Sequence, residues 1–216
     1  MIKGLDENEI LRYMGYPAGF APDADLRKNI KEKSEILLKT AKPKYVYNIF
    51  DIETIKNGVV LVNSDIILLG NSIKGHLKDS KKCVIMAATL GIEADKLIRR
   101  TQISSVSDAL IFDACATTYI EAFCDKVQNE IEEKYGACNF RFSPGYGDFP
   151  ISLQKDILKI LSAEKKIGLC VNSSDMLTPS KSVTAVIGLV DGCIQKTNKC
   201  ELCPNKERCA FTRYEK

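Results

Sequence analysis

The chain has 216 residues, of which 45% are apolar and 27% charged, and these ordinary proportions predict a single globular domain and exclude a disordered chain. Its 31 basic and 28 acidic residues leave a net charge of +3, which is too balanced for a protein dedicated to nucleic acid. No apolar run approaches the ~20 residues of a membrane span, and no apolar signal segment opens the chain. Nine cysteines without such a signal favour a reducing compartment, so we expect a cytoplasmic protein with no membrane partner.

Apolar periodicity predicts two helices in the N-terminal region, on either side of a turn at Gly15, Pro17 and Gly19, and Asp23 or Asp25 would cap the second. A long helix is expected over Ser105 to Tyr135, and a further one contains Leu153, Ile157, Leu158 and Leu161. Runs of high β propensity predict strands at Tyr45–Ile52, Val59–Val62, Ile66–Leu69, Cys83–Thr89, Ile167–Val171 and Ser182–Val190. We therefore expect one α+β domain over residues 1–190, in which a mixed or antiparallel sheet packs against a long helix.

One glycine-rich segment imitates a phosphate-binding loop. Gly70 and Gly75 have the required spacing, but His76 and Leu77 follow where that loop needs lysine and then serine or threonine, so we interpret the segment as a tight turn. His76 is the only histidine, and the chain has no Gly-x-Ser-x-Gly motif. A hydrolase triad is therefore not supported, and we interpret His76 as a structural residue.

Three other segments occur in an order that indicates a family. The central one is Arg141-Phe-Ser-Pro-Gly-Tyr146; it is preceded by Ile120-Glu-Ala-Phe123 and followed by Ile167-Gly-Leu169 and Met176-Leu-Thr-Pro-Ser-Lys-Ser-Val183. Together they resemble the activation, or reactivation, domain of cobalamin-dependent methionine synthase. The resemblance covers about seventy residues in register, and the preceding elements fit the same domain loosely.

The resemblance implies a domain that binds S-adenosylmethionine and supports the reductive methylation of cob(II)alamin to methylcobalamin. The cobalt is the nucleophile in that family, so no catalytic residue is expected and the domain acts by positioning the methyl donor. This would make the chain an accessory methyltransferase component in methionine biosynthesis. The chain lacks substrate, folate and cobalamin modules, so we expect it to act on a separate corrinoid methionine synthase core protein, with flavodoxin or ferredoxin as a further partner.

Six residues are candidates for contact with S-adenosylmethionine. The resemblance matches Glu121, Arg141 and Tyr146 to contacts of the family, with Ser143 contributing through its backbone. Chemically, an arginine offers a planar fork of donors that suits a carboxylate, and a tyrosine ring attracts a sulfonium or a stacked adenine. The set also includes Pro144 and Gly145, because a glycine without a side chain lets the backbone approach a ligand closely. The acidic contact that the family has before its arginine has no counterpart in residues 135–140.

The last 26 residues, 191–216, form an appended segment rich in cysteine. Cys193, Cys200, Cys203 and Cys209 follow a Cys-x6-Cys-x2-Cys-x5-Cys spacing, which is typical of a metal site in a reducing compartment. The spacing resembles the [4Fe–4S] loop of endonuclease III-type glycosylases, and a structural zinc or free thiols remain alternatives. The other five cysteines are interpreted as small core residues: Cys83, Cys115, Cys124, Cys138 and Cys170.

Two alternative functions remain open. The cysteine segment could belong to an iron–sulfur protein that binds nucleic acid, although the net charge argues against it and nucleic acid is not expected as a partner. Alternatively, the chain could be a non-catalytic scaffold that docks on a corrinoid protein.

Overall fold

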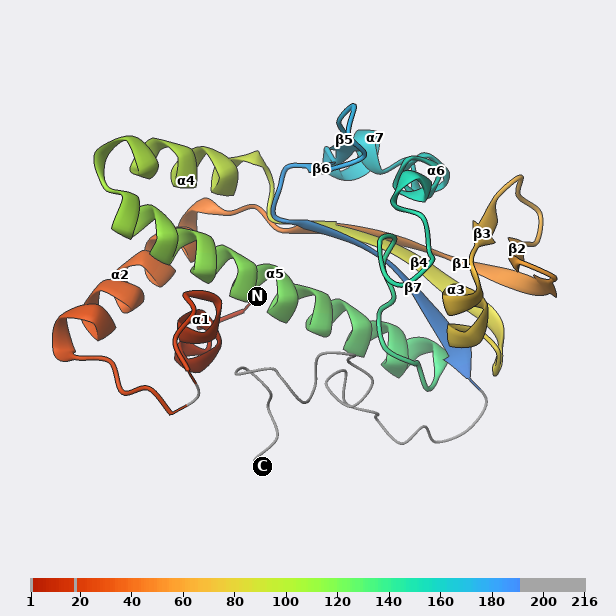
Figure 1. The fold of residues 1–216 in the computed structure, drawn as a ribbon, viewed down its shortest axis with the longest axis horizontal. Coiled ribbons are helices and arrows are strands. Elements are labelled where there is room, and N and C mark those ends of the chain that lie inside the picture. Colours follow the sequence, from red (N-terminus) through yellow and green to blue (C-terminus); the bar gives the residue numbers. More distant parts are fainter. Residues whose placement is uncertain (1, 18, 191–216) are drawn as a thin grey trace. The chain divides into compact units, whose positions relative to one another are not determined.

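The computed structural model of the chain describes residues 2–17 and 19–190 (Figure 1). These residues fall into two compact units. The described part of the first unit comprises residues 2–43 and 90–123, and that of the second comprises 44–89 and 124–190. The residues of the longest helix, α5 (Val106–Tyr135), are divided between the two units. None of the described helices combines the length and the apolar character needed to cross a membrane.

The first unit is helical. It contains α1 (Glu7–Tyr13), α2 (Ala24–Thr40), α4 (Ile92–Ser104) and the first part of α5. The carboxylate of Asp23 accepts a hydrogen bond from the Leu26 N–H at 2.8 Å, so Asp23 and not Asp25 caps α2. Helix α2 buries Ile30 and Leu37, seven residues apart on one helix face, while Leu26 on the same face is partly buried.

The second unit contains a five-stranded antiparallel sheet in the order β3-β2-β1-β4-β7. This antiparallel sheet and the helices that pack against it confirm the α+β class. The strands of the sheet are β1 (Lys44–Ile55), β2 (Gly58–Leu61), β3 (Ile67–Leu69), β4 (Ser80–Thr89) and β7 (Ser182–Val190). The remaining elements are α3 (Asn71–His76), a 3-10 turn (Ile151–Leu153), α6 (Gln154–Leu161), α7 (Ala163–Ile167) and the separate pair β5 (Cys170–Val171) and β6 (Leu177–Thr178).

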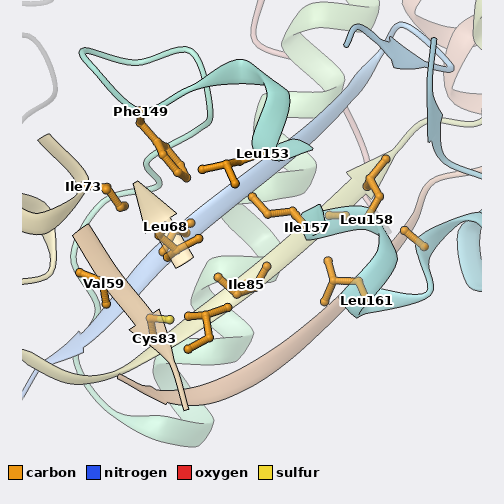
Figure 2. Close-up of a cluster of buried hydrophobic side chains, with 14 of the residues drawn as sticks. Val59, Leu68, Ile73, Cys83, Ile85, Phe149, Leu153, Ile157, Leu158 and Leu161 are labelled. Carbon is orange, nitrogen blue, oxygen red and sulfur yellow. The ribbon is translucent and has the colours of Figure 1, made fainter. Parts of the chain in front are cut away.

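The core of the second unit lies between one face of this sheet and helix α6. Figure 2 shows Ile157 and Leu161 of α6 pointing toward the sheet, where Ile85 of β4 meets them. Because side chains on a strand alternate between faces, Cys83 and Ile85 belong to this cluster. Phe149 is buried in the same cluster, which anchors the chain just before α6.

Three local predictions differ from the structure. The segment after Gly70 is the short helix α3 and not merely a tight turn. Helix α4 was not expected, because it buries only Ala94 and Asp95 and so has little apolar periodicity. The strand expected at Ile167–Val171 is reduced to β5, since Ile167 ends helix α7 and Gly168 follows it in the left-handed region, at φ 71°.

Candidate functional site

The segment that carries Arg141 runs antiparallel along the edge strand β7. Isolated bridges pair Cys138 with Leu189 and Phe142 with Val186. The Phe142 N–H donates to the Val186 carbonyl at 3.0 Å, and the Val186 N–H donates back at 2.8 Å. These reciprocal bonds fix the register of the segment, and therefore the level along β7 at which Arg141 lies.

Arg141 is buried, with only 6% of its side chain exposed, and its guanidinium is held by the part of α5 in the same unit. One Nη atom lies 2.8 Å from a carboxylate oxygen of Asp125, and the other donates to the Gln128 side-chain oxygen at 3.1 Å. Asp125 is 67% exposed, so the ion pair is buried at its cationic end and open to solvent at its anionic end. The site thus contains an oriented guanidinium whose carboxylate partner faces water.

A polar network extends from Arg141 through Gln128 to the sheet. The Gln128 amide donates to the Asn139 carbonyl at 3.1 Å and to the Glu132 carboxylate at 3.2 Å. The Asn139 side chain accepts from the Gly188 N–H at 2.7 Å and donates to the His76 carbonyl at 2.8 Å. Gly188 allows this approach, because a Cβ there would lie 2.7 Å from the Asn139 amide nitrogen. The orientation of Arg141 is therefore tied to β7 and α3.

Residues Ser143 to Tyr146 form a β-turn. The Tyr146 N–H donates to the Ser143 carbonyl at 3.1 Å, and Gly145 has a φ of 95°. Proline followed by a residue with positive φ is the signature of a type II turn, and only glycine adopts that φ readily. Pro144 is buried, whereas the Tyr146 side chain is 55% exposed, so the turn presents a tyrosine ring to solvent.

An aromatic cluster packs against this turn. The Tyr146 ring meets Phe142 edge-on, with centroids 5.6 Å apart, and Phe142 stacks on Phe149 at 6.1 Å. His76 lies against both Phe140 and Phe142, at 4.6 and 4.9 Å. Burial lowers the pKa of His76 to about 4, so its ring is neutral at physiological pH and behaves as part of the cluster.

Five of the six predicted contacts are neighbours in the sequence and lie in the second unit: Arg141, Ser143, Pro144, Gly145 and Tyr146. Glu121 lies on α5 among the residues of the first unit, where it is partly buried. Its nearest helical neighbours on the N-terminal side include Thr117, whose hydroxyl donates to the Asp113 carbonyl at 2.9 Å.

The predicted metal ligands Cys193, Cys200, Cys203 and Cys209 lie outside the described residues. Within residues 2–17 and 19–190, no group of three or more His, Cys, Asp or Glu side chains is arranged to hold a metal ion. Four of the five scattered cysteines are buried, as a core role predicts, and Cys170 is partly exposed. Burial raises the pKa of the Cys83 thiol to about 12, so this thiol stays protonated and inert.

Four supporting residues were missed by sequence reasoning: Asp125, Gln128, Asn139 and Asp148. Asp125 and Gln128 are three positions apart on α5, a spacing that places two polar side chains on one helix face. That spacing was a usable signal. Asn139 accepts from the Gly188 N–H, and Asp148 accepts from the Ser72 N–H at 2.8 Å, so both act through partners distant in sequence and no local pattern identifies them.

Comparisons with known proteins find a similar fold. No family model matches the chain, and no curated protein matches it. Among solved structures, the chain is similar to the MetH reactivation domain bound to AdoHcy, with a TM-score of 0.66 and 16% sequence identity. The alignment covers 89% of this chain and 76% of that chain. The expected fold of a methionine synthase reactivation domain is therefore confirmed.

Proposed function

We propose that the chain binds S-adenosylmethionine and serves as the activation component of a corrinoid-dependent methionine synthase. The single observation that carries this proposal is the combination, in one segment, of a buried oriented guanidinium at Arg141 and an exposed ring at Tyr146. The solved structure with a similar fold holds AdoHcy, the product that S-adenosylmethionine leaves after methyl transfer.

The charge arrangement at Arg141 suits the carboxylate of an amino-acid ligand. Asp125 already shows that a carboxylate reaches the guanidinium from the solvent side, at 2.8 Å. A ligand carboxylate would take the place of Asp125, whose exposed side chain can move into water at little free-energy cost. Gln128 would keep its own hydrogen bond and hold the guanidinium plane during this exchange.

The turn supplies the other half of the proposed site. The Pro144–Gly145 peptide has no side chain at its second residue, so a ligand can approach its backbone closely. The Tyr146 ring offers a π face to the positively charged sulfonium or to adenine. Glu121 is proposed as a contact for the ligand ammonium or ribose hydroxyls, and Ser143 as a contact through its backbone.

The proposed reaction needs a reductant and a corrinoid protein. One electron, from a flavodoxin or ferredoxin, converts cob(II)alamin on the partner to cob(I)alamin. The cobalt then forms a bond to the methyl carbon as the carbon–sulfur bond breaks, which leaves methylcobalamin and S-adenosylhomocysteine. The contribution of this chain is to hold the donor in line with the cobalt, and no proton transfer is required of its side chains.

A titration followed by a reactivation assay tests the proposal. Isothermal calorimetry with S-adenosylmethionine should show one site per chain, with weaker binding of methionine, which lacks the sulfonium and the adenosyl group. Addition of the chain and a reductant to a corrinoid methionine synthase core should then convert cob(II)alamin to methylcobalamin, visible in its absorption spectrum. Binding to that core without any response to S-adenosylmethionine would instead identify a scaffold.

The cysteine segment of residues 191–216 is proposed to bind a [4Fe–4S] cluster, with structural zinc as the alternative. Four thiols are the complete ligand set for either group. Iron, sulfide and zinc analysis of anaerobically purified protein separates the two, and Cys200→Ser is expected to abolish the bound metal. Protein that contains neither metal would refute both assignments, and steep salt-dependent binding to DNA would favour the nucleic-acid alternative.

A further inference from the structure

Asp148 makes a two-point contact with the start of helix α3. One carboxylate oxygen accepts from the Asn71 N–H at 2.7 Å, and the other accepts from the Ser72 N–H at 2.8 Å. The Asp148 N–H also points at the Ser72 hydroxyl, at 3.4 Å. The first N–H groups of a helix have no partner within the helix, so this carboxylate satisfies two of them.

The contact is charged at physiological pH. Hydrogen bonds from the backbone of Ser72 and Asn71, and then from the Ser72 side chain, lower the pKa of Asp148 to about 2. Hydrogen bonds from amides to an ionised carboxylate are stronger than those to a neutral acceptor.

Two glycines make the close approach possible. Gly70 has a φ of 122°, and a Cβ there would lie 2.8 Å from both the carbonyl and a carboxylate oxygen of Asp148. Gly147 has a φ of 55°, and a Cβ there would collide with the Ser72 hydroxyl. Gly70, the first glycine of the segment that imitates a phosphate loop, therefore has another use: the anion at the start of α3 is the chain's own carboxylate.

The contact of Asp148 with α3 lies two residues after the Ser143–Tyr146 β-turn. The Phe149 N–H donates to the Tyr146 carbonyl at 3.0 Å, and the Gly145 N–H donates to the Phe149 carbonyl at 2.8 Å. Phe149 is buried in the core, so the turn is fixed there on one side and at α3 by Asp148 on the other. Between these anchors, the backbone sets where the exposed Tyr146 ring points.

We infer that Asp148 is a positioning residue, which fastens the segment after the Ser143–Tyr146 β-turn to helix α3 and so orders the Tyr146 ring for its ligand. The inference rests on the proposed function, since the ligand concerned is S-adenosylmethionine. A turn that is already ordered in the free protein loses less conformational entropy when the ligand binds. Loss of the anchor should thus weaken binding without unfolding the second unit.

The test compares Asp148→Ala and Asp148→Asn with Asp65→Asn, which changes an exposed aspartate between β2 and β3. Calorimetry should show that Asp148→Ala lowers the affinity for S-adenosylmethionine on the order of tenfold. Asp148→Asn should restore part of the affinity, because its amide oxygen still accepts from one N–H. Asp65→Asn should leave the affinity unchanged. Gly147→Ala should weaken binding in the same way, because its Cβ displaces Ser72.

Measurements on the ligand-free protein separate this inference from the proposed function. In NMR spectra, Asp148→Ala should shift the amide protons of Asn71 and Ser72 upfield and accelerate exchange at Gly145 and Phe149, with a nearly unchanged melting temperature. Unchanged shifts and exchange would overturn the anchor, whether or not the wild type binds a ligand. Wild-type binding with the same affinity in Asp148→Ala would overturn the positioning role. A wild type that does not bind S-adenosylmethionine would instead refute the proposed function.

Discussion

Mild acid should destabilise the second unit through His76, the only histidine of the chain. Its ring packs against both Phe140 and Phe142, and its Nε2 atom is buried without a hydrogen-bond partner among the described residues. A proton on this ring would place a charge among aromatic side chains. Burial therefore lowers the pKa of His76 to about 4.

The sign and size of the effect follow from linkage. An unfolded histidine has a pKa near 6.5, so between about pH 6.5 and pH 4 the unfolded chain binds a proton that the folded chain does not. The free energy of unfolding therefore falls as the pH falls through this range. With the folded pKa at about 4, His76 accounts for a loss of about 2 kcal/mol at pH 5 and about 3 kcal/mol at pH 4.

Thermal unfolding of the wild type and His76→Phe across pH 7.5 to 4 measures this contribution. Phenylalanine keeps a ring in contact with Phe140 and Phe142 and removes the titrating group, while all other acid-sensitive groups are the same in both proteins. At about 2–4 °C per kcal/mol, the wild type should lose roughly 4–8 °C more than the variant at pH 5. Parallel melting curves, or an imidazole NMR titration with a midpoint near 6.5, would show that burial does not keep the His76 ring neutral.

Three further outcomes are expected. Gln128→Leu should lower the free energy of unfolding, measured in urea, by about 2–4 kcal/mol, because it leaves the buried Arg141 guanidinium without one acceptor. The control Gln102→Leu, on the exposed face of α4, should change this free energy by less than about 0.5 kcal/mol. Asp125→Asn should strengthen binding of S-adenosylmethionine in calorimetry, since the competing carboxylate is lost; weaker binding would exclude the exchange. Tyr146→Ala should reduce affinity roughly tenfold with an unchanged melting temperature, because the ring is mostly exposed.

The sequence predicts the elements that carry a continuous apolar run or a strong apolar periodicity. The strand runs at Val59–Val62 and Cys83–Thr89 match β2 and β4, because these runs are buried at nearly every position. The helix over Ser105 to Tyr135 matches α5, which buries a stripe of apolar residues along its length. The sequence does not predict helix α4 for the opposite reason: α4 buries two residues, and its apolar Ile103 is 90% exposed. Its existence depends on tertiary context, which a local pattern does not contain.

The candidate site is predictable where chemistry is local. The Pro144–Gly145 pair identifies a type II turn, since its backbone angles are dictated by two residue types. The ion pair of Arg141 with Asp125 joins residues 16 positions apart, and the Asp148 anchor joins residues 76 and 77 positions apart. Such pairs depend on strand register and helix placement, so they become visible only in the folded chain.

The most direct test of the proposed function is calorimetric titration of S-adenosylmethionine into the anaerobically purified wild type, Glu121→Gln, Arg141→Lys and a control, Lys155→Gln on the exposed face of α6. Glu121→Gln preserves size and Arg141→Lys preserves charge, so circular dichroism should stay unchanged. We expect binding by the wild type and the control, and a loss on the order of tenfold or more in both site variants. No wild-type binding, or equal affinity in all four proteins, would contradict an S-adenosylmethionine site at these residues.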